Sequence, residues 1–293
     1  MGQYSIKELE KLSGIKAHTI RIWEKRYGVI EPQRTSTNIR YYSDDDLKKI
    51  INVSLLNSHG LKISVIANMS GDELTRKVQD LSQTNHASNI HIDQLVTAMI
   101  DLDEEEFEHE LKMIEKKLGF EKTVIEIIYP FLNKIGILWQ TGNITPAHEH
   151  FISNLIRQKL IVAIAALPLP AKSSIRVLLF LPETELHEIA LLFYHYLARR
   201  YGFKTYYLGQ SVPHNDLKAV YAIHKPHFLI TSLTSVPAPK DLNDYLKKLS
   251  GDFPASRILA SGSLLRNASF KHPQNLNFFE TALELKTILT ELK

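Results

Sequence analysis

The chain has 293 residues, enough for two or three domains, and its 44% hydrophobic and 23% charged residues are ordinary for a soluble protein. It contains no cysteine, which excludes disulfides, thiolate metal sites and cysteine nucleophiles. Because the sequence has no apolar run of 18 residues and no basic-then-apolar signal after Met1, we expect a soluble, cytoplasmic protein.

The charge is unevenly distributed, although the net value of +3 does not by itself indicate a nucleic-acid partner. Residues 1–42 contain eight Lys/Arg against four Glu, whereas residues 101–126 contain ten Asp/Glu against four Lys. A basic end followed by an acidic middle predicts one domain that meets phosphate and another that does not.

The N-terminal segment, residues 1–75, has the pattern of a helix-turn-helix. Ser5 is a suitable N-cap for a first helix, Gly14 ends it, and a second helix is expected from about Ala17 to Arg26. Its apolar side holds Trp23, which we expect in the core. A polar turn between two arginines then predicts a small β-wing, and Ser43 predicts the cap of the following helix. The polar side of the second helix suits base edges and phosphates; it holds His18, Thr19, Arg21, Lys25 and Arg26.

These residues resemble a known family. The segments Thr19-Ile20-Arg21-Ile22-Trp23-Glu24, Tyr27-Gly28 and Arg40-Tyr41-Tyr42, with Pro32, Arg34 and Asn38 between them, are similar to the winged helix-turn-helix of MerR-type transcriptional regulators. The resemblance implies binding to a double-stranded, palindromic DNA operator by an oligomer, either a dimer or a tetramer. The implied DNA contacts are Thr19, Arg21, Tyr27, Arg34, Asn38, Arg40 and Tyr41.

The middle of the chain predicts a linker followed by helices. Residues 76–91 are polar, especially from position 80 onward, and no heptad pattern is sustained long enough for a coiled coil. Residues 92–168 show four amphipathic or apolar helical segments, the third over residues 124–138 and the fourth over residues 148–166, which predict a four-helix bundle.

One loop in this bundle carries an unusual set of side chains. Trp139 is followed, after nine residues, by Glu149-His150. On residue types alone, two interpretations are equally good: an indole cover over a bulky, part-polar ligand, or a core tryptophan followed by an ordinary helix cap. The spacing resembles the Trp-x9-Glu-His motif of cobalamin-dependent, CarH-type MerR photoreceptors, and implies that Trp139, Glu149 and His150 lie over the upper, adenosyl face of the cofactor.

The C-terminal segment, residues 172–293, alternates apolar runs with helical patterns. The runs at 177–181, 205–208, 228–231 and 258–260 predict four buried parallel strands in a flavodoxin-like (Rossmann-type) sheet. The fold class is therefore a multidomain α and α/β protein.

His187 follows the first strand at the edge where such sheets bind ligands. Glu185, two residues earlier, is suited to hold one ring nitrogen and leave the other for a metal. The pair resembles the (Asp/Glu)-x-His-x-x-Gly motif of cobalamin-binding domains, whose Ser-x-Leu and Gly-Gly motifs correspond to residues 231–233 and 261–262. The resemblance implies that His187 is the lower axial cobalt ligand, that Glu185 orients it, and that Ser232 and Gly262 border a buried nucleotide tail.

This sequence departs from the motifs at four positions. Ala190, Thr231 and Ser261 replace small motif residues, and each adds atoms where a ligand must pass close to the backbone. An added methyl group costs about 1–3 kcal/mol if the site does not relax. Gln140 stands where the photoreceptors have a histidine that captures cobalt after photolysis, and this argues against light sensing. His148 and His150 remain alternative ligands.

Three hypotheses follow. The first is a MerR-family regulator whose C-terminal half binds cobalamin, with adenosylcobalamin as the expected form, and thereby controls oligomerisation and operator binding. The second is the same regulator with a cofactor-free module that serves oligomerisation or partner binding. A cobalamin enzyme, such as a methyltransferase module, is disfavoured because the remaining length leaves no room for a substrate domain.

Overall fold

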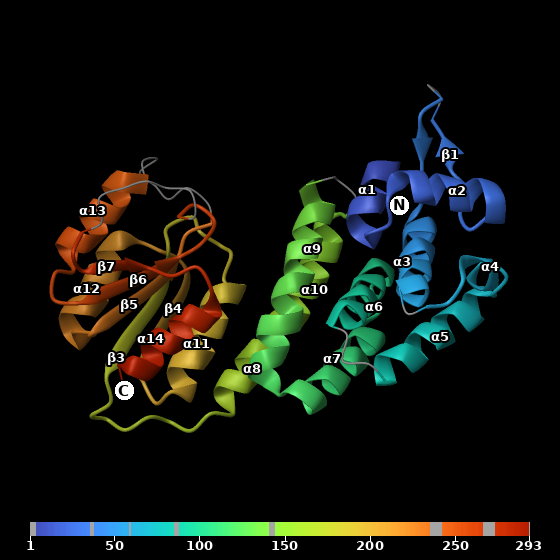
Figure 1. Cartoon of the computed structure of the whole chain (residues 1–293). Coiled ribbons are helices and arrows are strands. Elements are labelled where there is room, and N and C mark those ends of the chain that lie inside the picture. Colours follow the sequence, from blue (N-terminus) through green and yellow to red (C-terminus); the bar gives the residue numbers. More distant parts are fainter. Residues whose placement is uncertain are drawn as a thin grey trace. The chain divides into compact units, whose positions relative to one another are not determined.

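The structure is a computed structural model, and it describes residues 4–35, 38–58, 60–84, 88–140, 144–234, 242–265 and 273–292. The chain divides into two compact units, Met1–Ile152 and Ser153–Lys293 (Figure 1). In the described residues, the first unit consists of helices and one small hairpin, and the second is built around a parallel sheet. No helix of the described residues combines the length and apolar composition needed to cross a membrane.

Local capping determines the first two helices. The Ser5 hydroxyl accepts a hydrogen bond from the Glu8 amide at 3.4 Å, and the Glu8 carboxylate accepts one from the Ser5 amide at 2.5 Å. This capping box starts α1 (Ile6–Ser13), and Gly14, with φ of 75°, ends it. Helix α2 (Ala17–Tyr27) follows and ends at a second left-handed glycine, Gly28. Both predicted helices are confirmed.

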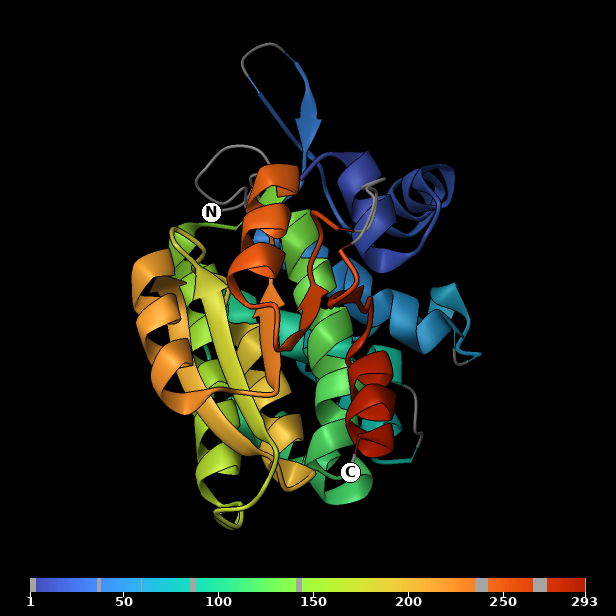
Figure 2. The same cartoon turned by 90° about the vertical axis from the view of Figure 1, so that its left-hand side faces the viewer.

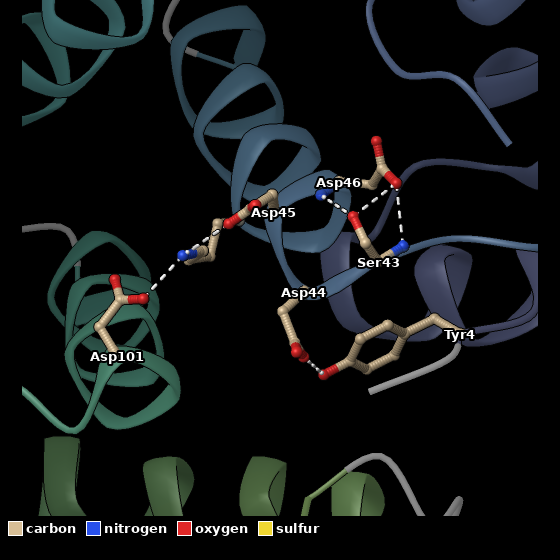
Figure 3. Close-up of polar contacts among 7 residues, drawn as sticks. Tyr4, Ser43, Asp44, Asp45, Asp46 and Asp101 are labelled. Carbon is tan, nitrogen blue, oxygen red and sulfur yellow. Dashed lines mark hydrogen bonds and ion pairs between the residues drawn. The ribbon is translucent and has the colours of Figure 1, made fainter. Parts of the chain in front are cut away.

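The wing and the next helix also form as predicted. Strands β1 (Gln33–Arg34) and β2 (Arg40–Tyr41) pair antiparallel, and they project from the helices as a hairpin (Figure 2). Helix α3 (Asp44–Ser58) begins where the Asp46 amide donates to the Ser43 hydroxyl at 3.2 Å (Figure 3). The Asp46 carboxylate accepts the Ser43 amide in return, at 2.8 Å.

Most of the segment expected as a linker is helical. After α4 (Ile63–Ile66), helix α5 (Gly71–Thr84) and helix α6 (Ser88–Asp101) occupy residues 76–84 and 88–91, so the linker prediction is wrong there. The reason is a second capping box, in which Ser70 and Glu73 exchange amide–side-chain hydrogen bonds of 2.9 and 3.2 Å. The buried side chains of Leu74 and Val78 then hold α5 against the unit.

Ion pairs hold the middle helices together. Helix α6 is joined to α7 (Glu104–Leu118) by the buried pair His91–Glu110. Asp93 of α6 pairs with Lys134 of α9 (Tyr129–Gln140), and burial raises the Asp93 pKa. Lys48 of α3 bridges Asp45 and Asp101 at 2.9 and 2.7 Å (Figure 3).

The four helical segments predicted for residues 92–168 are present, with two differences. The third begins at Phe120 rather than near position 124, because α8 (Phe120–Thr123) leads through a π-helical turn, η1 (Val124–Ile128), into α9. The fourth, α10 (Pro146–Ala165), begins in the first unit and continues into the second.

The second unit contains a five-stranded parallel sheet in the order β4-β3-β5-β6-β7. The four predicted strands are confirmed, and the short β7 was not predicted. The strands are β3 (Arg176–Pro182), β4 (Lys204–Val212), β5 (Phe228–Ser232), β6 (Arg257–Ser261) and β7 (Leu276–Phe278).

Helices cover both faces of this sheet. Helices α12 (His214–His224) and α13 (Leu242–Asp252) cover one face, and α11 (Ile189–Arg200) and α14 (Ala282–Glu291) cover the other (Figure 1). Because β3 lies between β4 and β5, the connections that leave β3 and β5 run to opposite faces, and the carboxyl edge between these two strands is the topological switch point where open α/β sheets bind ligands.

Candidate functional site

Helix α2 presents a basic face. Ile20 and Trp23 are buried, which confirms the core position expected for the tryptophan. Of the predicted DNA contacts on this helix, Arg21 is exposed, and Thr19 and Tyr27 are partly buried. Further exposed side chains of the same helix are His18, Ile22, Lys25 and Arg26. The cationic side chains suit contact with phosphates and base edges in a major groove.

The wing carries the other predicted contacts. Arg34 donates to the Asn38 side-chain oxygen at 2.7 Å, and Asn38 has a left-handed φ of 66°. Arg40 of β2 lies 3.5 Å from the Glu24 carboxylate of α2, and this ion pair links the wing to the helix. Arg34, Asn38 and Arg40 are exposed, while Tyr41 is partly buried. Helix α2 and the hairpin therefore offer cations from two neighbouring elements.

The loop after β3 holds Glu185 and His187 together. Glu185 is 1% exposed, and its Oε1 atom lies 2.6 Å from Nδ1 of His187 and accepts the His187 amide at 3.1 Å. Its Oε2 atom accepts the Thr234 amide at 2.8 Å, from the end of β5. The His187 side chain is 66% exposed. Because a carboxylate only accepts hydrogen bonds, this contact favours a proton on Nδ1 and leaves the lone pair on Nε2.

Small hydroxylic residues lie at the ends of β5 and β6. Thr231, Ser232 and Ser261 are buried, and the Thr231 hydroxyl has no hydrogen-bond partner among the described residues. The Ser261 hydroxyl donates to the Tyr194 hydroxyl of α11 at 3.0 Å. An unpaired buried hydroxyl is unfavourable unless a ligand or water completes it. The Ser261 hydroxyl, in contrast, is already hydrogen-bonded to α11.

The backbone at position 262 accepts only glycine without strain. Its φ is 119°, and a Cβ atom would lie 2.2 Å from the carbonyl oxygen of Leu233. Ala190, which replaces the motif glycine, is a partly buried residue in the first turn of α11.

The remaining predicted site residues lie in the first unit. The Trp139 backbone is helical, at the end of α9, and the side chains of Trp139 and Gln140 fall outside the described residues. At the start of α10, the Glu149 carboxylate lies 2.7 Å from Nδ1 of the exposed His150. His148 is hydrogen-bonded to a nearby residue, because its Nδ1 atom lies 3.0 Å from the Thr145 hydroxyl.

Sequence reasoning missed two contributors to the His187 loop. The Thr234 amide binds Glu185 from 49 positions away, and no sequence signal pointed to it. Glu188 is buried and directly follows His187. A carboxylate beside a proposed ligand was a signal that could have been used. The described residues contain no group of three His, Asp or Glu side chains able to hold a metal ion.

The comparisons with known proteins agree with this architecture. Residues 4–71 match the MerR HTH family regulatory proteins, and residues 91–163 match the B12 binding domain. The HTH-type transcriptional repressor CarH of Myxococcus xanthus is 31% identical over 259 residues, covering 86% of this chain and 85% of the relative. The repressor CarA of the same organism is 25% identical over 83% of this chain and 80% of its own.

A solved structure shares the fold. The monomethylamine corrinoid protein of Methanosarcina barkeri superposes with a TM-score of 0.54 at 15% identity, over 71% of this chain and 100% of its own. The relatives similar over most of the chain are transcriptional repressors rather than enzymes. Taken with the helix-turn-helix and the parallel sheet, these matches show that the chain belongs to the MerR family of transcriptional regulators that carry a B12-binding domain.

Proposed function

We propose that this regulator binds cobalamin through its helical and α/β parts and that the bound cofactor controls oligomerisation and operator binding. The observation that carries the proposal is the Glu185–His187 pair: a buried carboxylate holds an exposed imidazole at the carboxyl edge of β3. This edge is the topological switch point of the sheet, where α/β folds bind ligands.

The residues of the site suit a corrinoid. A single imidazole is enough for a cobalt ion that is already held by a macrocycle, and Glu185 would orient it. Ser232 and Gly262 would border the lower part of the ligand. When bound, cobalamin would supply a cobalt ion whose ligands can be exchanged. Trp139, Glu149 and His150 would lie over its upper face, where the adenosyl form, the one we propose, carries its adenosyl group.

DNA would be bound by Thr19, Arg21, Tyr27, Arg34, Asn38, Arg40 and Tyr41. We propose a palindromic operator and an assembly of two or four chains in the cytoplasm. The corresponding domains would be residues 1–75 for DNA, 92–168 for the cap over the cofactor and 172–293 for its lower side. Cobalamin can shift the assembly only by its difference in affinity for the two states.

An absorption titration tests the cofactor. Purified protein would be titrated with adenosylcobalamin in the dark, and again after green light. We expect a spectral change that is lost in His187→Ala and retained in His224→Ala, a control on a histidine at the far end of α12. With Gln140 in place of the capturing histidine, we expect no second protein histidine to bind the cobalt after illumination, so the illuminated spectrum should not be that of a cofactor held by two histidines. No spectral change and no co-elution at tens of micromolar cofactor would overturn the proposal.

One observation favours a second candidate, a regulator with a cofactor-free module. Position 261 is glycine in the B12 motif, but here it is a serine whose hydroxyl is already hydrogen-bonded to Tyr194 of α11. Under this alternative the chain assembles and binds its operator equally well with and without cobalamin. Analytical ultracentrifugation in the presence of operator DNA, with and without adenosylcobalamin, separates the two candidates.

A further inference from the structure

Glu188, the residue after the proposed cobalt ligand, connects its own loop with helix α10 and strand β4 of the second unit. It is the last residue before α11 and is 7% exposed. Its Oε1 atom accepts a hydrogen bond from Nε of Arg157, on α10, at 2.5 Å. Its Oε2 atom accepts one from the hydroxyl of Tyr207, on β4, at 3.0 Å. The loop after β3 is therefore attached both to a helix and to the neighbouring strand.

Each oxygen of the Glu188 carboxylate accepts one hydrogen bond. A buried carboxylate is strongly unfavourable unless charged or hydrogen-bonding groups compensate it, and here one oxygen has a cation and the other a hydroxyl. Burial, followed by the Glu188 charge, raises the Tyr207 pKa, so the phenol remains a donor. The Tyr207 ring is itself held by stacking on His195, with centroids 4.9 Å apart and planes inclined by 11°.

His187 thus lies between two anchored carboxylates. Glu185 is bound to the end of β5 through the Thr234 amide, and Glu188 to α10 and β4. Both glutamates are buried, whereas His187 between them is exposed. A short loop anchored on both sides of an exposed side chain restricts the positions of that side chain, which is the requirement for a metal ligand.

We infer that Glu188 is a positioning residue for His187, and that its ion pair with Arg157 is the link through which the ligand loop and helix α10 restrain each other. This inference rests on the proposed function, because His187 needs positioning only if it binds cobalt. A displacement of the loop on ligand binding either carries this part of α10 with it or breaks the pair. Glu149 and His150 lie in the first turns of this same helix.

Substitutions that preserve shape test the link. Glu188→Gln and Arg157→Gln should each weaken adenosylcobalamin binding about tenfold, the effect of losing one charge-assisted hydrogen bond. The double variant should be no weaker than either single one, because both remove the same interaction. Arg157→Lys retains the cation and should stay within about threefold of the wild type. Glu183→Gln, an exposed glutamate of the same loop, is the matched control.

Hydrogen–deuterium exchange gives a readout that a general loss of stability would not produce. Arg157→Gln should increase exchange of amides 184–188 in the absence of cofactor while leaving β6 unchanged. In the wild type, adenosylcobalamin should protect residues 153–165 of α10, and Arg157→Gln should remove that protection.

The outcomes distinguish the two proposals. If the wild type shows no spectral change with adenosylcobalamin, the proposed function fails, and the cofactor-free exchange of the loop still tests its attachment to α10. If the wild type binds and both glutamine variants bind equally well, the positioning role of Glu188 is refuted. Additive losses in the double variant would refute the direct link.

Discussion

Replacing Gly262 with alanine should strongly destabilise the α/β unit. A Cβ atom at this position would lie 2.2 Å from the Leu233 carbonyl oxygen and 2.6 Å from the Leu233 nitrogen. Neither atom moves easily, because the Leu233 amide donates to Ser261 at 2.8 Å and its carbonyl accepts from Leu264 at 3.2 Å. The φ of 119° is also unfavourable for any residue with a side chain.

The magnitude follows from these terms. A backbone conformation of this kind costs about 1–3 kcal/mol, and overpacking adds about 1–3 kcal/mol. We therefore expect Gly262→Ala to lower the free energy of unfolding by about 2–6 kcal/mol, a large part of the roughly 5–15 kcal/mol that stabilises a typical domain. Gly251→Ala is the matched control: this glycine lies in α13, and its Cβ would meet no atom within 4 Å. It should change stability by about 1 kcal/mol or less.

Urea unfolding followed with two signals measures the effect. Both tryptophans, Trp23 and Trp139, belong to the first unit, so tryptophan fluorescence follows that unit, and circular dichroism follows both. In Gly262→Ala the dichroism transition of the α/β unit should move to lower urea, while the fluorescence midpoint stays close to that of the wild type. A Gly262→Ala protein within about 0.5 kcal/mol of the wild type would refute the reasoning from the Leu233 contact.

Two further predictions concern DNA binding and pH. Arg40→Ala should weaken operator binding and reduce the slope of log K against log salt by about 1, as expected for one lost phosphate contact. Arg200→Ala, which changes an exposed arginine of α11, is the control. An unchanged slope in Arg40→Ala would contradict the assignment of the wing to DNA binding. Burial, followed by the nearby Arg199 charge, lowers the His195 pKa from 6.5 to about 4. Between these two pH values His195 is protonated in the unfolded chain and neutral in the folded one. Its titration should therefore lower the free energy of unfolding by about 2 kcal/mol as the pH falls from 6.5 to 4. His195→Gln should flatten urea midpoints measured across this range, and an identical slope in both proteins would contradict the assignment.

The parts of the fold that could be predicted are those with local causes. Ser5, Gly14 and Ser43 mark helix ends through contacts with residues three or four positions away, and the structure has all three. The Ser70–Glu73 capping box was an equally local signal, but the polar composition that follows it suggested a linker instead. Strand β7 has only three residues and depends on pairing with β6, so nothing local marks it.

The same distinction applies to the site. The contact between Glu185 and His187 spans two positions and could be expected from sequence. Three other contacts could not be expected from the sequence, because they join residues 19 to 67 positions apart. They are the contacts of Glu188 with Arg157 and Tyr207, and that of Ser261 with Tyr194. Such contacts depend on how α10, α11 and the sheet pack, which a single sequence does not specify. The effect of Ser261 was predicted as added bulk, whereas in the structure its hydroxyl also makes a hydrogen bond.

Strand β4 lies at one edge of the sheet and pairs with β3 along one side. A long edge strand can act as a template for a strand of another molecule, which is a route to aggregation. Here two register irregularities opposite residues 179–182 bend the strand, and Pro213 directly follows it without an amide hydrogen to donate. This edge of the sheet is therefore unsuited to pairing with a strand of another molecule. The register irregularities and Pro213 thus protect this side of the α/β unit from strand-to-strand aggregation.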